Sequence, residues 1–238
     1  MRETSETRRA EARIEAREAM EWRLLKERCR ALVMVTYSRF KIVLTTVLAA
    51  TWVAALGSGM QVLFKYETTP GSSGPITSKW PADSIVPRPP DKPMLLMVAH
   101  PHCPCTRASI AELAQIMAHA PDGAQATVLF VKPPGAGADW DDTDLRRSVA
   151  AIPGVRGLTD ENGKEAARFG AQTSGHTLVF GPDGTLLFSG GITATRGHVG
   201  TNAGENAALA ALRQQTPDRG QTAVFGCSLA NRNPGGKL

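Results

Sequence analysis

Residues 94–119 read MLLMVAHPHCPCTRASIAELAQIMAH, and this stretch decides the fold. It opens with a short apolar run, residues 94–99, that is typical of a buried strand, and apolar residues return at helical spacing after Pro104. Cys103 and Cys105 therefore lie where a strand meets the N-terminus of a helix. A thiolate in this position is stabilised by unpaired backbone N–H groups and by the positive end of the helix dipole. The pattern predicts two unusually reactive thiols.

Groups that can carry positive charge flank the two cysteines. His100 and His102 come just before them, and Arg107 comes just after. Positive charge near a thiol favours the thiolate. We expect these three residues, together with Thr177 further along the chain, to form the binding surface around the reactive thiols.

The cysteines are assigned roles from their positions. Proline suits the first position of a helix, so Pro104 predicts that Cys103 is the N-cap and has the more exposed sulfur. We therefore assign Cys103 as the attacking thiol and Cys105 as its partner. A disulfide between them would close a small, strained ring, because residues i and i+2 of a helix point in different directions. Cys227, in the late sequence AVFGCS, is either an alternative resolving thiol or a core cysteine.

The rest of the domain follows from periodicity and turn signals. An apolar run at residues 126–131 predicts a second strand, and the turn sequence GPDG at 181–184 joins two more, at 177–180 and 185–189. Helices are expected at 144–152, 164–169 and 203–215. Helices that cross between the early strands, followed by a late hairpin, predict an α/β domain.

Taken together, the strand, the cysteine-containing turn, the crossover, the hairpin and the closing helix resemble the thioredoxin fold, which is a central mixed sheet flanked by helices. More narrowly, HCPCTRAS at 102–109, TSGHTLVFGPDGTLLFSGGIT at 173–193 and VFGC at 224–227 look like the membrane-anchored thioredoxin-like proteins of the RedB type. The resemblance spans residues 94–229. It implies thiol–disulfide exchange with a protein partner and no cofactor.

Two departures from the thioredoxin pattern concern the site. Thioredoxin-like oxidoreductases normally carry CxxC, whereas this chain has CxC. They also place a cis-proline before the hairpin, where this chain has His176, so a trans peptide is expected. His176 can tune a thiolate, move a proton or bind a metal, or it can be a hydrogen-bonded structural histidine. We count it as a catalytic candidate with the three cysteines.

Copper binding is the main alternative function. Thiolates and imidazoles are good copper ligands, and the membrane-tethered copper chaperones of the Sco type, which share the thioredoxin fold, combine two cysteines with a distant histidine. Here Cys103, Cys105 and His176 would be the ligands, with Cys227 as a possible fourth. The cysteines of Sco proteins are more widely spaced than those of this chain.

The N-terminal part of the chain carries a membrane signal. Residues 1–41 hold 11 Lys and Arg against seven Glu, and no charged residue or histidine occurs from 42 to 64. That run spans roughly 34 Å as a helix, enough to cross a bilayer core. A basic start before such a run is a topology signal rather than a nucleic-acid arm, so no nucleic acid is expected as a partner. The basic side is expected in the cytoplasm and the following domain in the periplasm.

These observations predict five segments. A charged cytoplasmic helical segment at 1–40 is followed by a single-pass inner-membrane anchor at 41–65 and by an extended tether at 66–93, rich in Pro, Gly and Ser. The thioredoxin-like domain covers 94–230, and a tail covers 231–238. The glycine-rich loop at 190–198 either brings Arg196 and His198 to the site or is a structural connection. Walker-type phosphate loops and serine-nucleophile elbows are absent from the sequence.

Overall fold

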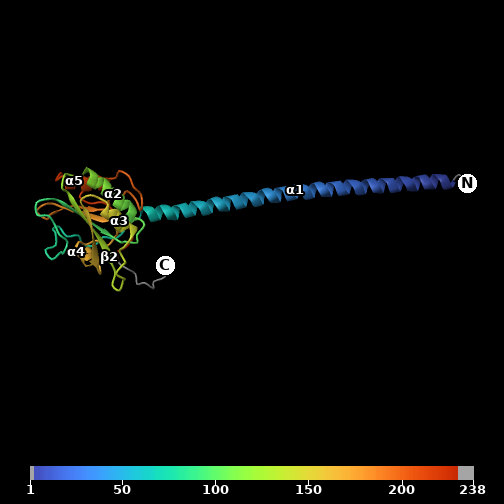
Figure 1. Ribbon diagram of the computed structural model, residues 1–238. Helices are drawn as coiled ribbons and strands as arrows, with labels where there is room; N and C mark the ends of the chain where they lie inside the picture. Colours follow the sequence, from blue (N-terminus) through green and yellow to red (C-terminus); the bar gives the residue numbers. More distant parts are fainter. Residues whose placement is uncertain (1–2, 230–238) are drawn as a thin grey trace. The chain divides into compact units, whose positions relative to one another are not determined.

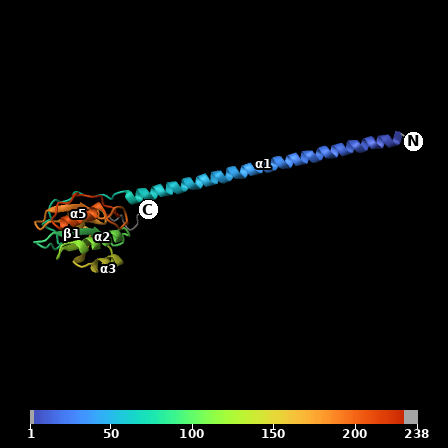
Figure 2. The ribbon, with the colours of Figure 1, turned by 90° about the horizontal axis from the view of Figure 1, so that it is seen from above.

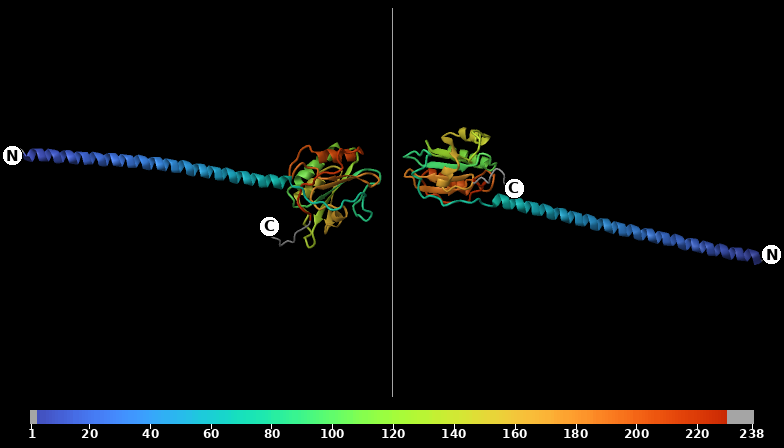
Figure 3. Two further views of the ribbon diagram at one scale, coloured as in Figure 1. Left: turned by 180° about the vertical axis from the view of Figure 1, so that it is seen from behind. Right: turned by 90° about the horizontal axis from the view of Figure 1, so that it is seen from below.

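The computed structural model describes residues 3–229, and the chain divides into two compact units after Val62. The predicted tail at 231–238 lies outside the described residues. Helix α1 (Glu3–Thr68) forms the first unit and continues a few residues into the second (Figure 1). It is one unbroken helix in the two further views (Figure 3), so the predicted boundary between residues 40 and 41 is a change of composition within a single element.

The apolar part of α1 has the properties of a membrane span. Within the described residues it is the one helix that is long and apolar enough to cross a bilayer, by length and composition, and its apolar side chains are exposed. The hydroxyls of Thr45, Thr46 and Thr51 donate to carbonyls three or four residues earlier in the same helix, at 2.8–2.9 Å. Polar groups satisfied within their own helix are what a hydrocarbon environment requires.

The second unit contains a mixed five-stranded sheet. Its strands lie in the order β3-β2-β1-β4-β5, with β1, β2 and β3 parallel to one another and β4 and β5 antiparallel to their neighbours. The elements are β1 (Met94–Ala99), α2 (Thr106–His119), β2 (Gln125–Lys132), α3 (Asp144–Ala150), β3 (Val155–Glu161), α4 (Lys164–Arg168), β4 (His176–Phe180), β5 (Leu186–Gly190) and α5 (Ala203–Leu212). A mixed sheet with flanking helices confirms the predicted fold class.

The two faces of the sheet are covered differently. Side chains of α2, α3 and α5 share one core with the odd-numbered residues of β1, such as Leu95 and Met97, and Figure 2 shows α2 and α5 next to the sheet. The even-numbered residues, such as Leu96, face a second core that contains Phe169, next to α4. This alternation follows from the two-residue period of a strand. The short helix α4 leaves part of that second face to be covered by other segments.

The segment at 66–93, predicted to be an extended tether, is packed on this second face over residues 71–88 instead of standing clear of the domain. The Trp80 ring meets the rings of Phe169 and Phe180 edge-on, with centroids 5.0 Å apart in each case. Val86 is buried, and the backbone N–H of Trp80 donates to the carbonyl of Gly184 at 2.8 Å. The chain is extended, as its prolines require, but its spaced apolar side chains stabilise the domain by covering the core next to α4.

Candidate redox site

The loop between β1 and α2 places the first two thiols. The Cys103 N–H donates to the His100 carbonyl at 3.1 Å, and the Thr106 N–H donates to the Cys103 carbonyl at 3.1 Å. Helix α2 begins at Thr106, so its cap residue is Cys105 rather than Cys103. The predicted exposure is also wrong, because Cys103 is 2% exposed and Cys105 is 9% exposed. Pro104 lies in the turn before the helix, and that turn directs the Cys103 side chain inward.

A strand-like segment near the C-terminus brings the third thiol to the same place. The Ser174 N–H donates to the Cys227 carbonyl, and the Leu229 N–H donates to the Gln172 carbonyl, both at 2.8 Å. Gly226 makes this pairing possible. A Cβ on Gly226 would lie 1.9 Å from the Ser174 carbonyl oxygen, far inside van der Waals contact. The glycine thus allows the two backbones to approach closely, as glycine does elsewhere in proteins.

The three sulfurs of Cys103, Cys105 and Cys227 form one cluster. All three lie within 4.8 Å of one another, and the Sγ atoms of Cys103 and Cys227 are 2.9 Å apart. All three are free thiols, and Cys227 is only partly buried. The 2.9 Å contact therefore joins the predicted attacking cysteine to the alternative resolving cysteine.

The thiols titrate differently because they are hydrogen-bonded to one another. The hydrogen bond with Cys227, together with one from Thr106, lowers the pKa of Cys103 well below that of a free cysteine. The same hydrogen bond with Cys103 raises the pKa of Cys227, and burial adds to this. Burial and the neighbouring Cys103 charge raise the pKa of Cys105. The cluster thus favours one thiolate, on Cys103, beside two protonated thiols.

Two hydroxyl groups outside the predicted site residues hold the cysteine loop. The Ser174 Oγ accepts a hydrogen bond from the His100 N–H at 2.8 Å and lies 2.7 Å from the Thr106 Oγ1. Both hydroxyls are buried. Thr106 directly follows the CPC motif, and Ser174 lies near the position where thioredoxin-like proteins carry their proline. These positions were the signal that could have identified them.

His176 and Thr177 are the first two residues of β4. His176 shares the sheet face of Leu178 and Phe180, is 1% exposed, and places its Nε2 atom 2.8 Å from the Ser189 Oγ. Burial lowers its pKa to about 4, so the ring is neutral at pH 7. It is not a member of the cysteine cluster, so the structure does not bring His176 together with Cys103 and Cys105 as one set of ligands. Side-chain alternation along β4 directs the ring to the other core.

The Thr177 side chain is 0% exposed and donates to the Gly175 carbonyl at 3.2 Å. It lies inside the sheet between β1 and β5, so it has no surface with which to bind a partner, and that expectation is corrected. All peptide bonds among the described residues are trans, including the one that precedes His176.

The remaining predicted binding residues form a surface beside the cysteine loop. The His102 ring packs edge-on against Trp140 with centroids 4.5 Å apart, and His100 packs against the same indole at 5.9 Å. Arg107 forms an exposed ion pair with Asp144. The cation that acts on the thiols is instead Arg196, whose charge offsets part of the rise in the pKa of Cys105 and of Cys227. The glycine-rich loop therefore reaches the site through Arg196.

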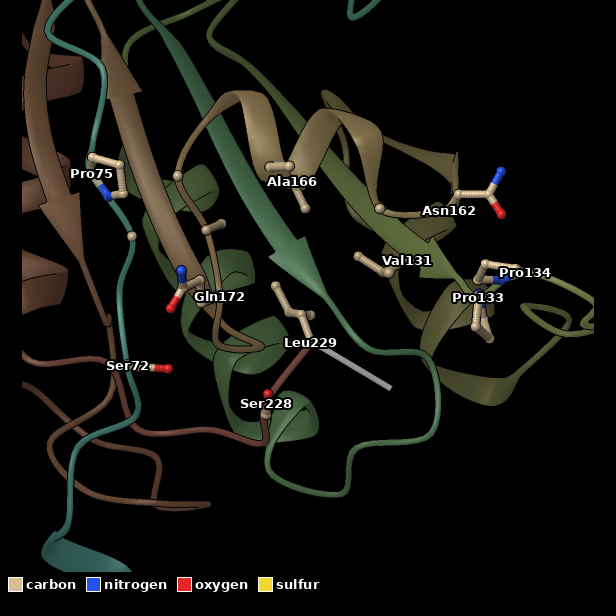
Figure 4. Close-up of a pocket in the computed structure, with 15 residues that line it drawn as sticks. Ser72, Pro75, Val131, Pro133, Pro134, Asn162, Ala166, Gln172, Ser228 and Leu229 are labelled. Carbon is tan, nitrogen blue, oxygen red and sulfur yellow. The ribbon is translucent and has the colours of Figure 1, made fainter. Parts of the chain in front are cut away.

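A cavity of about 560 Å³ borders the segment that carries Cys227 (Figure 4). Ser228 and Leu229, the two residues after Cys227, form part of its wall. The opposite walls come from α4, from the end of β2 near Pro133, and from the extended segment near Pro75. Two of the lining residues directly follow Cys227 in the sequence, but the three cysteines themselves do not line the cavity.

Comparison with known proteins supports the architecture. No family model matches the chain, and no curated protein matches it. Among solved structures, an uncharacterized conserved protein from Geobacillus kaustophilus is 19% identical, with a TM-score of 0.51 over 69% of this chain and 93% of that one. The strand order and the helix-flanked mixed sheet described above are those of a thioredoxin-like fold. At this identity the likeness concerns the fold alone.

Two further solved structures are more distant. The exposed lipoprotein thioredoxin Etrx1 of Streptococcus pneumoniae is 18% identical, with a TM-score of 0.34 over 52% of this chain and 84% of that one. Copper-bound ScoI of Arabidopsis thaliana is 14% identical, with a TM-score of 0.36 over 52% of this chain and 83% of that one.

Proposed function

We propose that this chain is a membrane-anchored thiol–disulfide oxidoreductase in which Cys103 and Cys227 form the redox pair. The 2.9 Å separation of their sulfurs carries the proposal. Attack on a disulfide needs a thiolate, and the lowered pKa of Cys103 supplies one at neutral pH. A partly buried thiol held beside it can resolve the product. The finer RedB-type identity is part of this proposal and rests on the motifs quoted above.

The exchange proceeds in two balanced steps. The Cys103 thiolate attacks one sulfur of a partner disulfide, and a Cys103–partner mixed disulfide forms as the other partner sulfur leaves as a thiolate and takes up a proton. Cys227 then loses its proton and attacks the Cys103 sulfur, which releases the second partner thiolate. The partner gains two electrons, and the protein is left with a Cys103–Cys227 disulfide. The reverse sequence oxidises a partner dithiol.

The surroundings of the pair give the other candidates their roles. Cys105 lies within reach of both sulfurs and can replace Cys227 as the resolving thiol. The surface of His100, His102 and Trp140 next to the loop is the proposed docking surface for a protein partner. Segment 1–40 is proposed to lie in the cytoplasm, with the α1 span in the inner membrane and the thioredoxin-like domain in the periplasm, where thiol–disulfide chemistry is permitted.

A disulfide reductase assay on the full-length protein in detergent tests this function. Cys103→Ser is expected to abolish turnover, because a hydroxyl cannot replace the attacking thiolate. Cys29→Ser is the matched control, since Cys29 is an exposed cysteine of α1 outside the cluster, and it is expected to retain full activity. Full turnover in the Cys103→Ser variant would refute the proposal.

Delivery of copper is the second candidate function, and the three-sulfur cluster supports it. Thiolates are soft ligands that favour Cu(I), and the three sulfurs lie close enough to bind one ion. The ligands would be Cys103, Cys105 and Cys227, with copper as cargo. This candidate predicts that the protein retains one Cu(I) against a competing chelator and that Cys105→Ser loses it. Thiol–disulfide exchange through Cys103 and Cys227 does not require Cys105, so this variant separates the two functions.

A further inference from the structure

Arg196 caps the C-terminal end of α1. Its backbone N–H donates to the Glu67 carbonyl at 3.1 Å, its Nε to the Tyr66 carbonyl at 3.2 Å and its Nη2 to the Thr69 carbonyl at 3.1 Å. A helix leaves its last four carbonyls without partners inside the helix, so these bonds satisfy groups that would otherwise need water. The guanidinium also lies 4.7 Å from the centroid of the Tyr66 ring.

The same guanidinium holds the peptide that carries Cys227. Its Nη1 donates to the carbonyl of Gly226, the residue just before Cys227. The next carbonyl, that of Cys227 itself, accepts the Ser174 N–H at 2.8 Å. Two successive carbonyls are thus fixed from two sides. One side chain joins residues 66–69, just beyond the apolar span of α1, to a segment more than 150 residues later.

We propose that Arg196 is a positioning residue, which ties the end of the anchor helix to the Cys227 peptide and thereby keeps the Cys227 sulfur beside that of Cys103. The inference rests on the proposed exchange between these two thiols. Arginine suits this position because its planar guanidinium presents five N–H donors in a fixed fork, and here they reach three carbonyls from two segments. Lysine has the same charge but only one nitrogen at its end.

This contact makes the geometry of the redox site depend on residues that directly follow the apolar span. The residues that hold Cys227 in place include residues 66–69, the first turn of chain after the apolar span, and this turn belongs to the same compact unit as the site. Removing that turn is expected to loosen Cys227 even though no cysteine is removed. The turn that follows the apolar span therefore contributes to the geometry of the exchange.

The test uses the full-length protein in detergent and two substitutions of Arg196. The equilibrium between the Cys103–Cys227 disulfide and a glutathione buffer is measured by mass spectrometry. Arg196→Met and Arg196→Lys are both expected to shift it by about tenfold toward the dithiol, because holding two reacting groups in place raises their effective concentration and a loosened Cys227 loses part of this gain. Arg213→Met is the matched control, because the Arg213 guanidinium donates to the carbonyl of His119, at the C-terminal end of α2. It is expected to leave the equilibrium unchanged.

Each result has a defined meaning. An Arg196→Lys protein that behaves as the unsubstituted protein would show that charge alone matters and would overturn the positioning role. Thermal unfolding of each variant shows whether the domain is still folded. The Cys29→Ser, Cys105→Ser variant leaves Cys103 and Cys227 as the two remaining thiols. In this variant, the rate at which a short bifunctional thiol reagent crosslinks the two measures their proximity independently of the redox equilibrium. Failure of the unsubstituted protein to form the disulfide would refute the proposed function, while unchanged bridging after Arg196→Met would refute this inference.

Discussion

Gly226→Ala is expected to separate the redox pair. The added Cβ would lie 1.9 Å from the Ser174 carbonyl oxygen, and real Cβ atoms essentially never come closer than 3.0 Å to such a neighbour. The backbones at Gly226 and Ser174 must therefore separate by about 1.1 Å or more, the difference between these distances. Cys227 is the next residue, and its sulfur lies 2.9 Å from that of Cys103. A displacement of this size is expected to slow disulfide closure by about 10²-fold, with a loss of unfolding free energy of about 1–3 kcal/mol.

The assay follows closure directly. The reduced protein is mixed with glutathione disulfide, samples are acid-quenched over time, and the Cys103–Cys227 linkage is quantified by mass spectrometry. Gly220→Ala is the control, because a Cβ there has no atom within 4 Å, and it should close at the unsubstituted rate. Closure in Gly226→Ala at that same rate would refute the reasoning, since the pair would not depend on the close approach of the two backbones.

Three further predictions concern the thiols and His176. Replacing Cys227 with Ala should raise the pKa of Cys103 toward that of an ordinary cysteine, while replacing it with Ser should raise the pKa less, because the serine hydroxyl can still donate a hydrogen bond. The pH profile of Cys103 alkylation measures this pKa. Equal profiles for the two variants would contradict the assigned cause. Cys105→Ser should still form the Cys103–Cys227 disulfide in a peptide map, and loss of that linkage would show that Cys105 is required. Because burial lowers the pKa of His176 from 6.5 to about 4, the unfolded chain binds this proton more readily, so the free energy of unfolding should fall by up to roughly 3 kcal/mol as the pH drops from 6.5 to 4. His176→Gln should remove that part of the pH dependence in denaturant titrations, and an unchanged dependence would show that the ring is not held neutral.

The sequence predicted those parts of the fold whose signal is local. Strand β1 is a continuous apolar run, α2 has apolar residues at helical spacing, and the GPDG turn marks the hairpin of β4 and β5. Strand β3 was missed because its sequence, VRGLTDE, has no apolar run, and as an edge strand it is only partly buried. The packing of residues 71–88 was missed for a related reason. Proline and glycine predict an extended chain, but they do not show which surface it covers.

The candidate site, too, could be predicted from the sequence only in part. Cys103 and Cys105 were found because they are neighbours in the sequence at a strand-to-helix junction. The approach of Cys227 depends on the pairing of its segment with Gln172 and Ser174, which neither segment reveals by itself. His176 was expected near the thiols from its place in the chain, but the alternation of side chains along β4 directs it to the opposite core. Contacts between distant segments decide these cases.

The measurement that tests the central claim most directly is a disulfide map of the full-length protein, purified without reductant, with metal content determined on the same sample. We expect a Cys103–Cys227 disulfide, free Cys29 and Cys105, and no stoichiometric metal. A Cys103–Cys105 disulfide would contradict the assignment of the redox pair. Three reduced thiols with one bound copper would contradict thiol–disulfide exchange and would instead support delivery of copper.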